Sequence, residues 1–217
     1  MTYAMTRLIL IRHGESEANL VGQFAGHYDI PLTALGLEQA EQTAAQLATE
    51  RIDVVYSNDL RRAADTAKPH AERRGLTVIK RQDLREIYCG RWEGQTFSKI
   101  AETENDLFSY GFRDHFFAFS MPEGESVLEC GLRFYQAVAQ IAGENVGKTV
   151  LIVAHGAVLR AFWGMICGAD FSDEQINAKY PYPSNASYSI VDFDGTHFIP
   201  VEFSHDSHLT TVTHLHI

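Results

Sequence analysis

The sequence predicts an α/β fold: a three-layer α/β/α sandwich around a mostly parallel central sheet. Short apolar segments alternate along the chain with longer amphipathic segments, as expected when helices cross over between parallel strands. The segments 8–11 and 149–154 are apolar almost throughout, which is typical of strands buried on both faces. Two alternating segments near the C-terminus predict a closing hairpin.

The first half of the chain predicts three strands and two helices. The strand at 8–11 ends abruptly in Arg12-His13-Gly14. A helix follows over 33–50, with Thr33 as N-cap and with one apolar face made of Leu37, Ala40, Ala44 and Leu47. The next elements are a strand at 54–56, a helix over 59–74 that Pro69 should kink or split, Gly75 as the C′ residue of that helix, and a strand at 77–79.

Residues 90 to 145 predict a helical insertion rather than a second domain. Two helical segments, 96–109 and 125–143, flank a phenylalanine-rich connection at 112–119, and no polar linker sets the region apart. We therefore expect 1–217 to be a single domain with an insertion at about 90–145. The remaining elements are a strand at 149–154, a helix over 158–166, and a hairpin of 187–193 and 197–203 joined by Asp194-Gly195.

The composition is that of a globular protein without a nucleic-acid partner. The 217 residues are 45% hydrophobic and 21% charged, which argues against disorder and fibrous repeats. Lys and Arg number 18 against 28 Asp and Glu, a formal net charge of −10, whereas a nucleic-acid binder presents a basic face. Taken alone, this charge also argues against an anionic substrate.

The three cysteines, Cys89, Cys130 and Cys167, predict neither a disulfide framework nor a zinc site. They are odd in number, widely spaced and without a C-x-x-C pair, which indicates a reduced protein. The apolar run 8–11 is too short for a signal peptide, and no run approaches the roughly 20 apolar residues of a membrane span. We expect a cytoplasmic protein without a membrane partner; the sequence leaves a homodimer open.

Charged and polar residues follow four predicted strand ends. Two strands end in a histidine, His13 and His155, a third leads to the arginine pair 61–62, and a fourth approaches Glu86. Each residue taken singly is an ordinary turn, core or surface residue. In open α/β sheets, however, ligands bind outside the carboxyl ends of the strands, so the coincidence of position predicts one shared site.

The residue types at these strand ends suit phosphoryl transfer through a covalent intermediate. A neutral imidazole is a nucleophile near pH 7, and His13 fits this role. The charge on the transferred group calls for several cationic donors, which Arg12, Arg62 and His155 would supply. Glu86 fits the acid that protonates the departing oxygen and later deprotonates the attacking water.

Five ordered segments resemble the histidine phosphatase superfamily, also called the phosphoglycerate mutase-like family. The opening motif, Ile-Leu-Ile-Arg-His-Gly-Glu-Ser-Glu-Ala-Asn, stands at 9–19. The later landmarks resemble 29–36, 57–67, 84–86 together with 92–94, and 153–156. An Arg-His-Gly triplet alone is a weak signal, but five landmarks in order cover most of the chain.

The resemblance implies a role for each matching residue. His13 would be phosphorylated during turnover, with Arg12, Arg62 and His155 around the phosphoryl group and Glu86 as proton donor. Of the two adjacent arginines, the family pattern selects Arg62, since it places its arginine directly before the alanine matched by Ala63. Further substrate-binding positions are Asn19, Gly26 and Gly156. The resemblance implies no metal ion and no organic cofactor.

Departures from the mutase pattern favour a phosphatase. Mutases carry extra polar and basic groups for a carboxylate and a second phosphate, and at the matching positions this chain has Ala25, Cys89, Phe97 and Ala157. The expected arginine pair in the insertion is also missing, since Arg113 stands alone. Each charge-assisted hydrogen bond contributes roughly 1.5–3 kcal/mol, so several losses should defeat mutase affinity. We therefore predict hydrolysis of a small phosphate monoester.

Two alternatives to this prediction stay open. One is a phosphoglycerate mutase, and the other is a non-catalytic phosphate-binding regulator, which the presence of both histidines and the acid argues against. The segments 121–126 and 204–209 resemble the phosphatase branch more weakly.

The insertion at 96–124 is expected to cover the strand ends as a lid. Its aromatic rings would either contact the leaving group or, more often in such segments, pack the insertion against the main body. These rings are Phe97, Phe108, Tyr110, Phe112, Phe116, Phe117 and Phe119. Four histidines near the C-terminus, at positions 205, 208, 214 and 216, fit no zinc pattern and predict an exposed tail.

Overall fold

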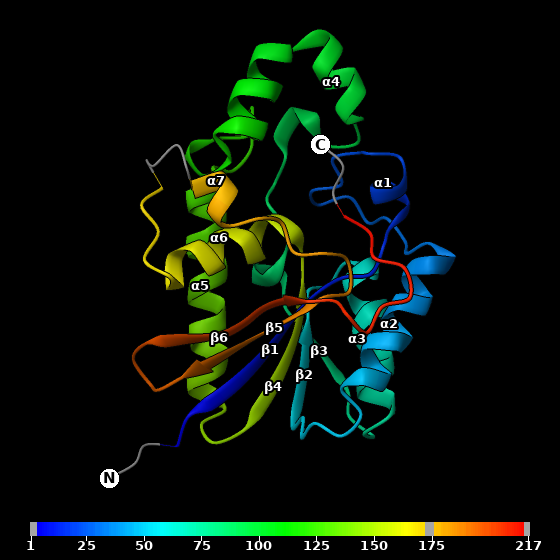
Figure 1. The fold of residues 1–217 in the computed structure, drawn as a ribbon, viewed down its shortest axis with the longest axis vertical. Helices are drawn as coiled ribbons and strands as arrows, with labels where there is room; N and C mark the ends of the chain where they lie inside the picture. Colours follow the sequence, from blue (N-terminus) through cyan, green and yellow to red (C-terminus); the bar gives the residue numbers. More distant parts are fainter. Residues whose placement is uncertain (1–3, 172–175, 215–217) are drawn as a thin grey trace.

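The computed structural model describes residues 4–171 and 176–214, and this part of the chain forms a six-stranded sheet in the order β3-β2-β4-β1-β5-β6 (Figure 1). The strands are β1 (Thr6–Arg12), β2 (Val54–Ser57), β3 (Val78–Lys80), β4 (Thr149–Ala154), β5 (Tyr188–Phe193) and β6 (Phe198–His205). The first four are mutually parallel, β5 runs antiparallel to β1, and β6 runs antiparallel to β5. The predicted mostly parallel sheet and its closing hairpin are confirmed.

Strand β1 explains why the central segments are uninterrupted apolar runs. Leu8 and Leu10 belong to the core on one face of the sheet, whereas Ile9 and Ile11 belong to the core on the other. Successive side chains of a strand point to opposite faces, so a strand with two covered faces needs apolar residues at every position.

Helices cover both faces of the sheet, which confirms the three-layer architecture. Helices α2 (Ala34–Gln46) and α3 (Arg61–Glu72) pack together on one side, and α5 (Val127–Glu144) and α6 (Gly156–Ile166) pack together on the other (Figure 1). The short helices α1 (Glu17–Leu20) and α7 (Ile176–Lys179) lie in connections.

The predicted helix over 33–50 is confirmed at its start and corrected in two respects. The hydroxyl of Thr33 accepts from the backbone N–H of Gly36 at 3.0 Å, as expected of an N-cap. The helix ends at Gln46, however, and the side chain of Leu37 is 51% exposed, so it is not part of the buried face. Ala40 and Ala44 are buried as predicted.

Pro69 does not split α3, so this one of the two predicted effects is absent. The helix continues to Glu72, and the Pro69 carbonyl still accepts from the N–H of Arg73 at 3.3 Å. Proline lacks only its own N–H, and here it stands in the last turn, so few helical hydrogen bonds follow it. Gly75 has a φ of +65°, in the left-handed region that favours glycine after a helix.

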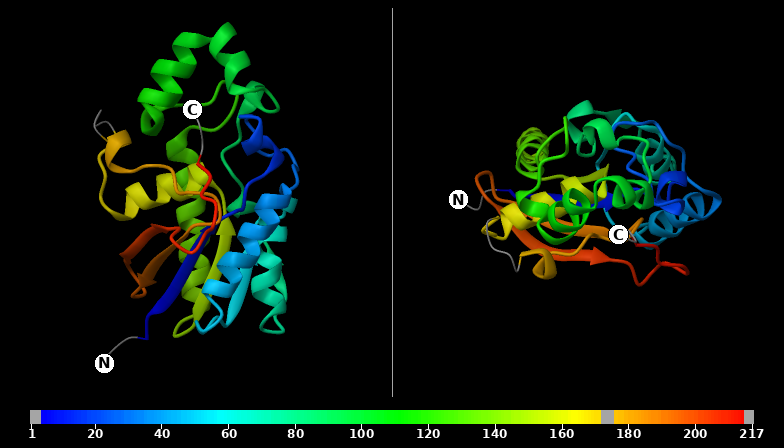
Figure 2. Two further views of the ribbon diagram at one scale, coloured as in Figure 1. Left: turned by 45° about the vertical axis from the view of Figure 1, so that its right-hand side comes forward. Right: turned by 90° about the horizontal axis from the view of Figure 1, so that it is seen from above.

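The segment between β3 and β4 rises above the carboxyl ends of the strands (Figure 2). It contains η1 (Gln82–Leu84), η2 (Gly90–Trp92), α4 (Phe97–Thr103), the π-helical η3 (Leu107–Asp114) and η4 (Phe116–Ala118) before α5 begins. The predicted helical segment at about 96–109 is helical but divided: α4 ends at Thr103, and η3 begins at Leu107. All six phenylalanines of the insertion are buried, whereas Tyr110 is 66% exposed.

The predicted exposed C-terminal tail is wrong for two of its histidines. His205 ends β6 and stacks on Tyr188, with ring centroids 4.8 Å apart, and His208 lies 5.8 Å beyond it. The hydroxyl of Thr43 contacts Nε2 of His208 at 2.9 Å. His214 is exposed as expected, and position 216 lies outside the described residues.

None of the helices within residues 4–171 and 176–214 has the length and hydrophobicity that crossing a bilayer requires.

Candidate active site

The register of the sheet brings the two predicted histidines together. Arg12, the last residue of β1, stands opposite Ala154, the last residue of β4, so the chain leaves both strands at the same level. The residues that follow are His13 and His155, and their ring centroids lie 5.0 Å apart at an interplanar angle of 64°. The predicted shared site at the carboxyl edge of the sheet is therefore present.

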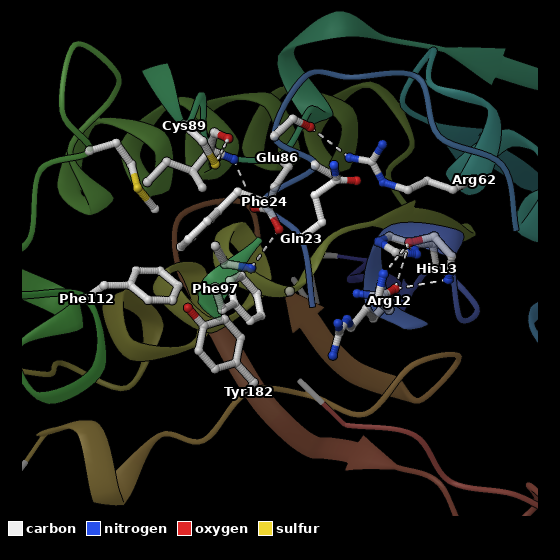
Figure 3. Close-up of a pocket in the computed structure, with 18 residues that line it drawn as sticks. Arg12, His13, Gln23, Phe24, Arg62, Glu86, Cys89, Phe97, Phe112 and Tyr182 are labelled. Carbon is white, nitrogen blue, oxygen red and sulfur yellow. Dashed lines mark hydrogen bonds between the residues drawn. The ribbon is translucent and has the colours of Figure 1, made fainter. Parts of the chain in front are cut away.

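The predicted residues surround one pocket, which has about 540 Å³ of empty space including its open mouth. Seven of the eight predicted side chains and backbone positions line it: Arg12, His13, Asn19, Gly26, Arg62, Glu86 and Gly156. His155 lies directly behind them, fully buried. Figure 3 shows Arg12, His13 and Arg62 gathered on one side of the pocket.

His13 is held as a neutral imidazole with one nitrogen available. Its Nδ1 lies 2.7 Å from the carbonyl oxygen of Gly14, which places the proton on Nδ1 and leaves the lone pair on Nε2. Burial, and then the positive charges of Arg62 and Arg12, hold the pKa of His13 well below its ordinary value. At neutral pH the ring is therefore an uncharged nucleophile.

His155 is the N-cap residue of α6 and faces the same two charges. Arg62 donates through Nε to Nδ1 of His155 at 3.3 Å, and the side-chain amide of Asn58 contacts the Nε2 side. A guanidinium cannot accept, so Nδ1 of His155 is the acceptor in this contact. Burial, followed by the charges of Arg62 and other neighbours, holds the pKa of His155 well below its ordinary value.

The two guanidinium groups are buried and are anchored by backbone carbonyls. Arg12 donates through Nη1 to the carbonyl of Pro183 at 2.6 Å, and Arg62 donates to the carbonyls of Tyr28 at 2.7 Å and Gly26 at 2.8 Å. Burial lowers the pKa of each arginine to about 10, so both stay charged at neutral pH. Nε of Arg12 has no hydrogen-bond partner within the described residues.

The surroundings of these arginines suit an anion. Glu86 is near enough to raise the pKa of both, yet none of the described carboxylates forms an ion pair with either guanidinium. Buried charges without a paired counter-ion are expensive, and a bound anion would supply the missing charge and accept from the free Nε of Arg12.

Glu86 reaches the rim of the pocket and is held by the start of α6. Its Oε2 accepts from the N–H of Ala157 at 3.0 Å, and its Oε1 accepts from the N–H of Val158 at 3.1 Å. Its own neighbour Ile87 donates to Oε1 at 2.9 Å. Because α6 begins directly after His155, one helix start orients both the carboxyl group and the second histidine.

The predicted substrate-binding positions differ in what they contribute. Oδ1 of Asn19 accepts from the N–H of Ser16 at 3.0 Å and from Asn185 at 3.1 Å, which leaves its Nδ2 as the group that can donate to a ligand. Gly26 has a φ of +45°, and a Cβ there would overlap the carboxylate of Glu93, so the position requires glycine. At Gly156 a Cβ would lie 3.3 Å from Nε of Arg12.

Three buried polar residues support the site, and the sequence motifs did not single them out. Thr66 accepts from the N–H of Gly14 at 3.0 Å, Asn185 donates to the carbonyl of His13 at 3.1 Å, and Asn58 contacts His155. Thr66 and Asn58 lie inside the landmark at 57–67, so the motif could have pointed to them. Asn185 comes from a loop far along the chain, and no local pattern distinguishes it.

The other side of the pocket is apolar. Phe24, Phe97, Phe112, Met121 and Tyr182 line it, together with Ala25, Ile87, Cys89 and Ala157 (Figure 3). The phenylalanines of the insertion pack into the core, as expected, and two of them, Phe97 and Phe112, also line the pocket wall. In the described part of the chain, no three His, Cys, Asp or Glu side chains are grouped to bind a metal ion.

The sequence pattern of the histidine phosphatase superfamily (branch 1) matches residues 8–206. The chain belongs to this superfamily. The match spans the pocket and nearly all of the sheet, and it confirms the resemblance drawn from the five motifs.

Relatives of this chain are named as phosphatases or as phosphoglycerate mutases. The chain is 31% identical to phosphoserine phosphatase 1 of Hydrogenobacter thermophilus, over 94% of this chain and 95% of that protein. It is 33% identical to a metal-independent phosphoserine phosphatase of Arabidopsis thaliana, over 96% and 85% respectively. Among solved structures, Bacillus stearothermophilus YhfR superposes with a TM-score of 0.87 at 28% identity, covering 94% of this chain and 99% of that one.

Proposed function

We propose that this protein is a metal-independent phosphatase that hydrolyses small phosphate monoesters through a phosphohistidine on His13. The observation that carries the proposal is a neutral, oriented imidazole beside two buried guanidinium groups that form no ion pair with any carboxylate of the described residues. The arginines supply the positive charge that a phosphoryl group requires, so the residues present suit the reaction without a bound cation. The relative from Arabidopsis thaliana, named as metal-independent, supports the same reading.

In the first step, Nε2 of His13 attacks phosphorus, and the ester P–O bond breaks as the P–N bond forms. Arg12 and Arg62, which line the pocket, donate to the equatorial oxygens, where negative charge is spread in the transition state, and His155, buried directly behind them, completes the phosphoryl-binding group that the family pattern implies. Glu86 gives its proton to the departing alcohol oxygen. The Gly14 carbonyl, which accepts from Nδ1, stabilises the positive charge that develops on the imidazole ring.

In the second step, water attacks the phosphohistidine and releases inorganic phosphate. Glu86, now a carboxylate, takes the proton from the water, and the P–N bond breaks to regenerate neutral His13. The N–H groups at the start of α6 hold the carboxyl group in one place for both proton transfers.

Hydrolysis is favoured over mutase activity by the positions of the substituted residues. Ala25, Cys89, Phe97 and Ala157 all line the pocket, so the polar groups expected of a mutase are missing where the substrate would lie. Arg113 does not line this pocket but an adjoining hollow, which shares Phe112 and Tyr182 with it. A second phosphate or a carboxylate would therefore be poorly held.

The test is hydrolysis of p-nitrophenyl phosphate in the presence of EDTA, with trapping of the phosphorylated protein by rapid acid-free quenching and mass spectrometry. Wild type should turn over and carry phosphate on His13, whereas His13→Ala should lose activity by at least about 10⁴-fold. The matched control is His197→Ala, in the exposed β5–β6 turn, which should keep wild-type activity.

Three results would contradict the proposal. Activity that needs added metal, or that survives in His13→Ala, would exclude the mechanism. Efficient interconversion of 3- and 2-phosphoglycerate with the bisphosphate primer would identify a mutase. Phosphate binding without turnover or phosphohistidine would identify a non-catalytic regulator.

A further inference from the structure

The pocket has two chemically different ends. Among the described residues, Arg12 and Arg62 are the only Lys or Arg side chains that line it, and both lie at the end that would hold the phosphoryl group. The opposite end, here called the leaving-group end, is lined by Phe24, Ile87, Cys89, Phe97, Phe112 and Met121. Figure 3 shows the labelled rings of this end gathered away from the arginines.

The leaving-group end is a preformed surface rather than a loose set of rings. Phe24 lies at its centre, with ring centroids 4.7 Å from Phe97 and 4.9 Å from Phe112 in edge-to-face contacts, and 5.2 Å from Trp92. Each of these rings is at least nine-tenths buried, so its orientation is set by packing. An apolar group entering the pocket therefore meets a wall that needs no reordering.

Tyr182 adds a ring that is held in place by a second set of contacts. Its centroid lies 5.2 Å from that of Phe116, and the guanidinium carbon of Arg160 lies 4.5 Å above its face. Arg160 in turn donates through Nε to the carbonyl of Tyr180 at 2.6 Å, which ties α6 to the loop that carries Tyr182. The ring can thus pack against a planar ligand without losing conformational freedom on binding.

The same end offers little to a carboxylate. Among its polar neighbours, Gln23 has its Nε2 committed to the carbonyl of Gly94, and Glu86 supplies no positive charge. A carboxylate placed there would lose its water and gain no cation in return. The two relatives named as phosphoserine phosphatases therefore do not predict the substrate of this pocket.

We propose that this pocket selects phosphate monoesters of uncharged alcohols with an aromatic or other planar apolar group, and discriminates against carboxylate-bearing esters such as phosphoserine and 3-phosphoglycerate. This specificity rests on the proposed phosphatase function. It locates substrate choice in the aromatic wall supplied by the loop around Phe24 and by the insertion.

The experiment compares kcat/KM for three alkyl esters of similar intrinsic reactivity: 2-phenylethyl phosphate, ethyl phosphate and O-phospho-L-serine. Alkyl esters are chosen because an aryl leaving group would accelerate hydrolysis whatever the pocket. We expect 2-phenylethyl phosphate to exceed phosphoserine by about a hundredfold or more, with ethyl phosphate between them.

Two substitutions test separately the role of the aromatic ring and the effect of the missing cation. Phe112→Leu keeps the wall apolar but removes a ring, and should lower kcat/KM for 2-phenylethyl phosphate about tenfold more than for ethyl phosphate. Ala25→Arg places a cation on a half-exposed part of the pocket wall, and should raise kcat/KM for phosphoserine about tenfold. Its control is Val146→Arg, which adds the same charge at a 58% exposed position before β4.

The possible outcomes distinguish a failure of the proposed substrate preference from a failure of the proposed phosphatase function. Equal or better hydrolysis of phosphoserine by wild type would overturn the substrate class while leaving the phosphohistidine mechanism intact. A Phe112→Leu variant that slows all three esters equally would overturn the role of the ring. Failure to hydrolyse any ester, with no phosphohistidine formed, would refute the phosphatase function itself and the specificity with it.

Discussion

The two ends of the pocket are built in opposite ways. At the phosphoryl end, charged and polar side chains follow strand ends, and backbone groups hold each of them: Gly14 holds His13, Pro183 holds Arg12, and the start of α6 holds Glu86. At the leaving-group end, apolar side chains from distant segments meet only by packing. The chemistry of the site is therefore encoded locally, whereas its selectivity is encoded by how the insertion packs on the rest of the chain.

This difference predicts two kinds of mutational response. A change at the phosphoryl end should affect every ester, because each substrate presents the same phosphoryl group. A change at the leaving-group end should affect esters unequally, because only some of them reach the rings. The predictions that follow test this contrast from the largest expected effect to the smallest.

Arg62→Ala should reduce kcat/KM by about 10²–10³-fold for 2-phenylethyl and ethyl phosphate alike, since a preorganised donor to the transition state is lost. The control is its neighbour Arg61, which is exposed in the same turn of α3, and Arg61→Ala should keep wild-type rates. Steady-state kinetics of each of the two variants with each of the two esters, compared with wild type, measures these effects. A loss confined to one ester would break the proposed division between the ends.

Inorganic phosphate should stabilise the folded protein through the phosphoryl end alone. At a concentration one hundred times its Kd, the free energy of unfolding should rise by about 2.7 kcal/mol. Arg12→Gln should abolish most of this gain, because the unpartnered Nε of Arg12 is lost as a donor. Arg7→Gln, at the other end of β1, should keep it. Urea unfolding with and without phosphate gives the values, and an unchanged response in Arg12→Gln would contradict the anion site.

His70 is a buried histidine that does not line the pocket, so its effect on stability can be compared with that of the pocket residues. It lies on α3, as Arg62 does, but both of its ring nitrogens lack partners within the described residues. Burial, with smaller contributions from Arg74 and Arg73, lowers its pKa to about 3. Below about pH 6.5 the unfolded chain therefore binds a proton that the folded chain does not, and stability is lost as pH falls towards 3.

Replacing His70 should remove the part of the loss of unfolding free energy at low pH that this histidine causes. Between pH 7 and pH 5, wild type should lose about 2 kcal/mol more unfolding free energy than His70→Leu. Unfolding curves at the two pH values measure the difference. His13 and His155 contribute loss of the same sign to both proteins, so their effect cancels. Parallel losses in both proteins would show that His70 is not buried as a neutral ring.

Met121→Leu should have almost no effect on stability or activity, and is the smallest effect expected at the leaving-group end. A volume-conserving apolar swap changes the free energy of unfolding by less than about 1.5 kcal/mol. The wall stays apolar and its rings stay in place, so kcat/KM for 2-phenylethyl phosphate should change less than about threefold. A selective loss as large as that of Phe112→Leu would show that the thioether, not the rings, recognises the leaving group.

Much of the fold could be predicted because its signals are local. The apolar run at 8–11 indicates a strand with two covered faces, and Thr33 marks the start of α2 through one hydrogen bond. The failures have tertiary causes. Leu37 faces solvent because the packing of α2 turns that position away from the core, and His208 is drawn in by Thr43 and by ring stacking. Neither contact has a sequence pattern.

The residues of the candidate site also differ in whether the sequence could predict them. The motifs around His13, Arg62, Glu86 and His155 named every charged group of the phosphoryl end, since each is fixed by its place after a strand. Asn185 could not be found, because its hydrogen bond to the His13 carbonyl joins residues 172 positions apart.

The sequence by itself determined the layered fold, the family and the charged groups of the pocket, because strand-end motifs carry both position and chemistry. Only the tertiary structure decided that the two arginines lack a paired carboxylate, that the imidazole proton is on Nδ1 of His13, and that Phe24 and Phe112 form one wall. Those properties depend on burial and on contacts between distant segments, and burial is what turns a cluster of charges into an anion site.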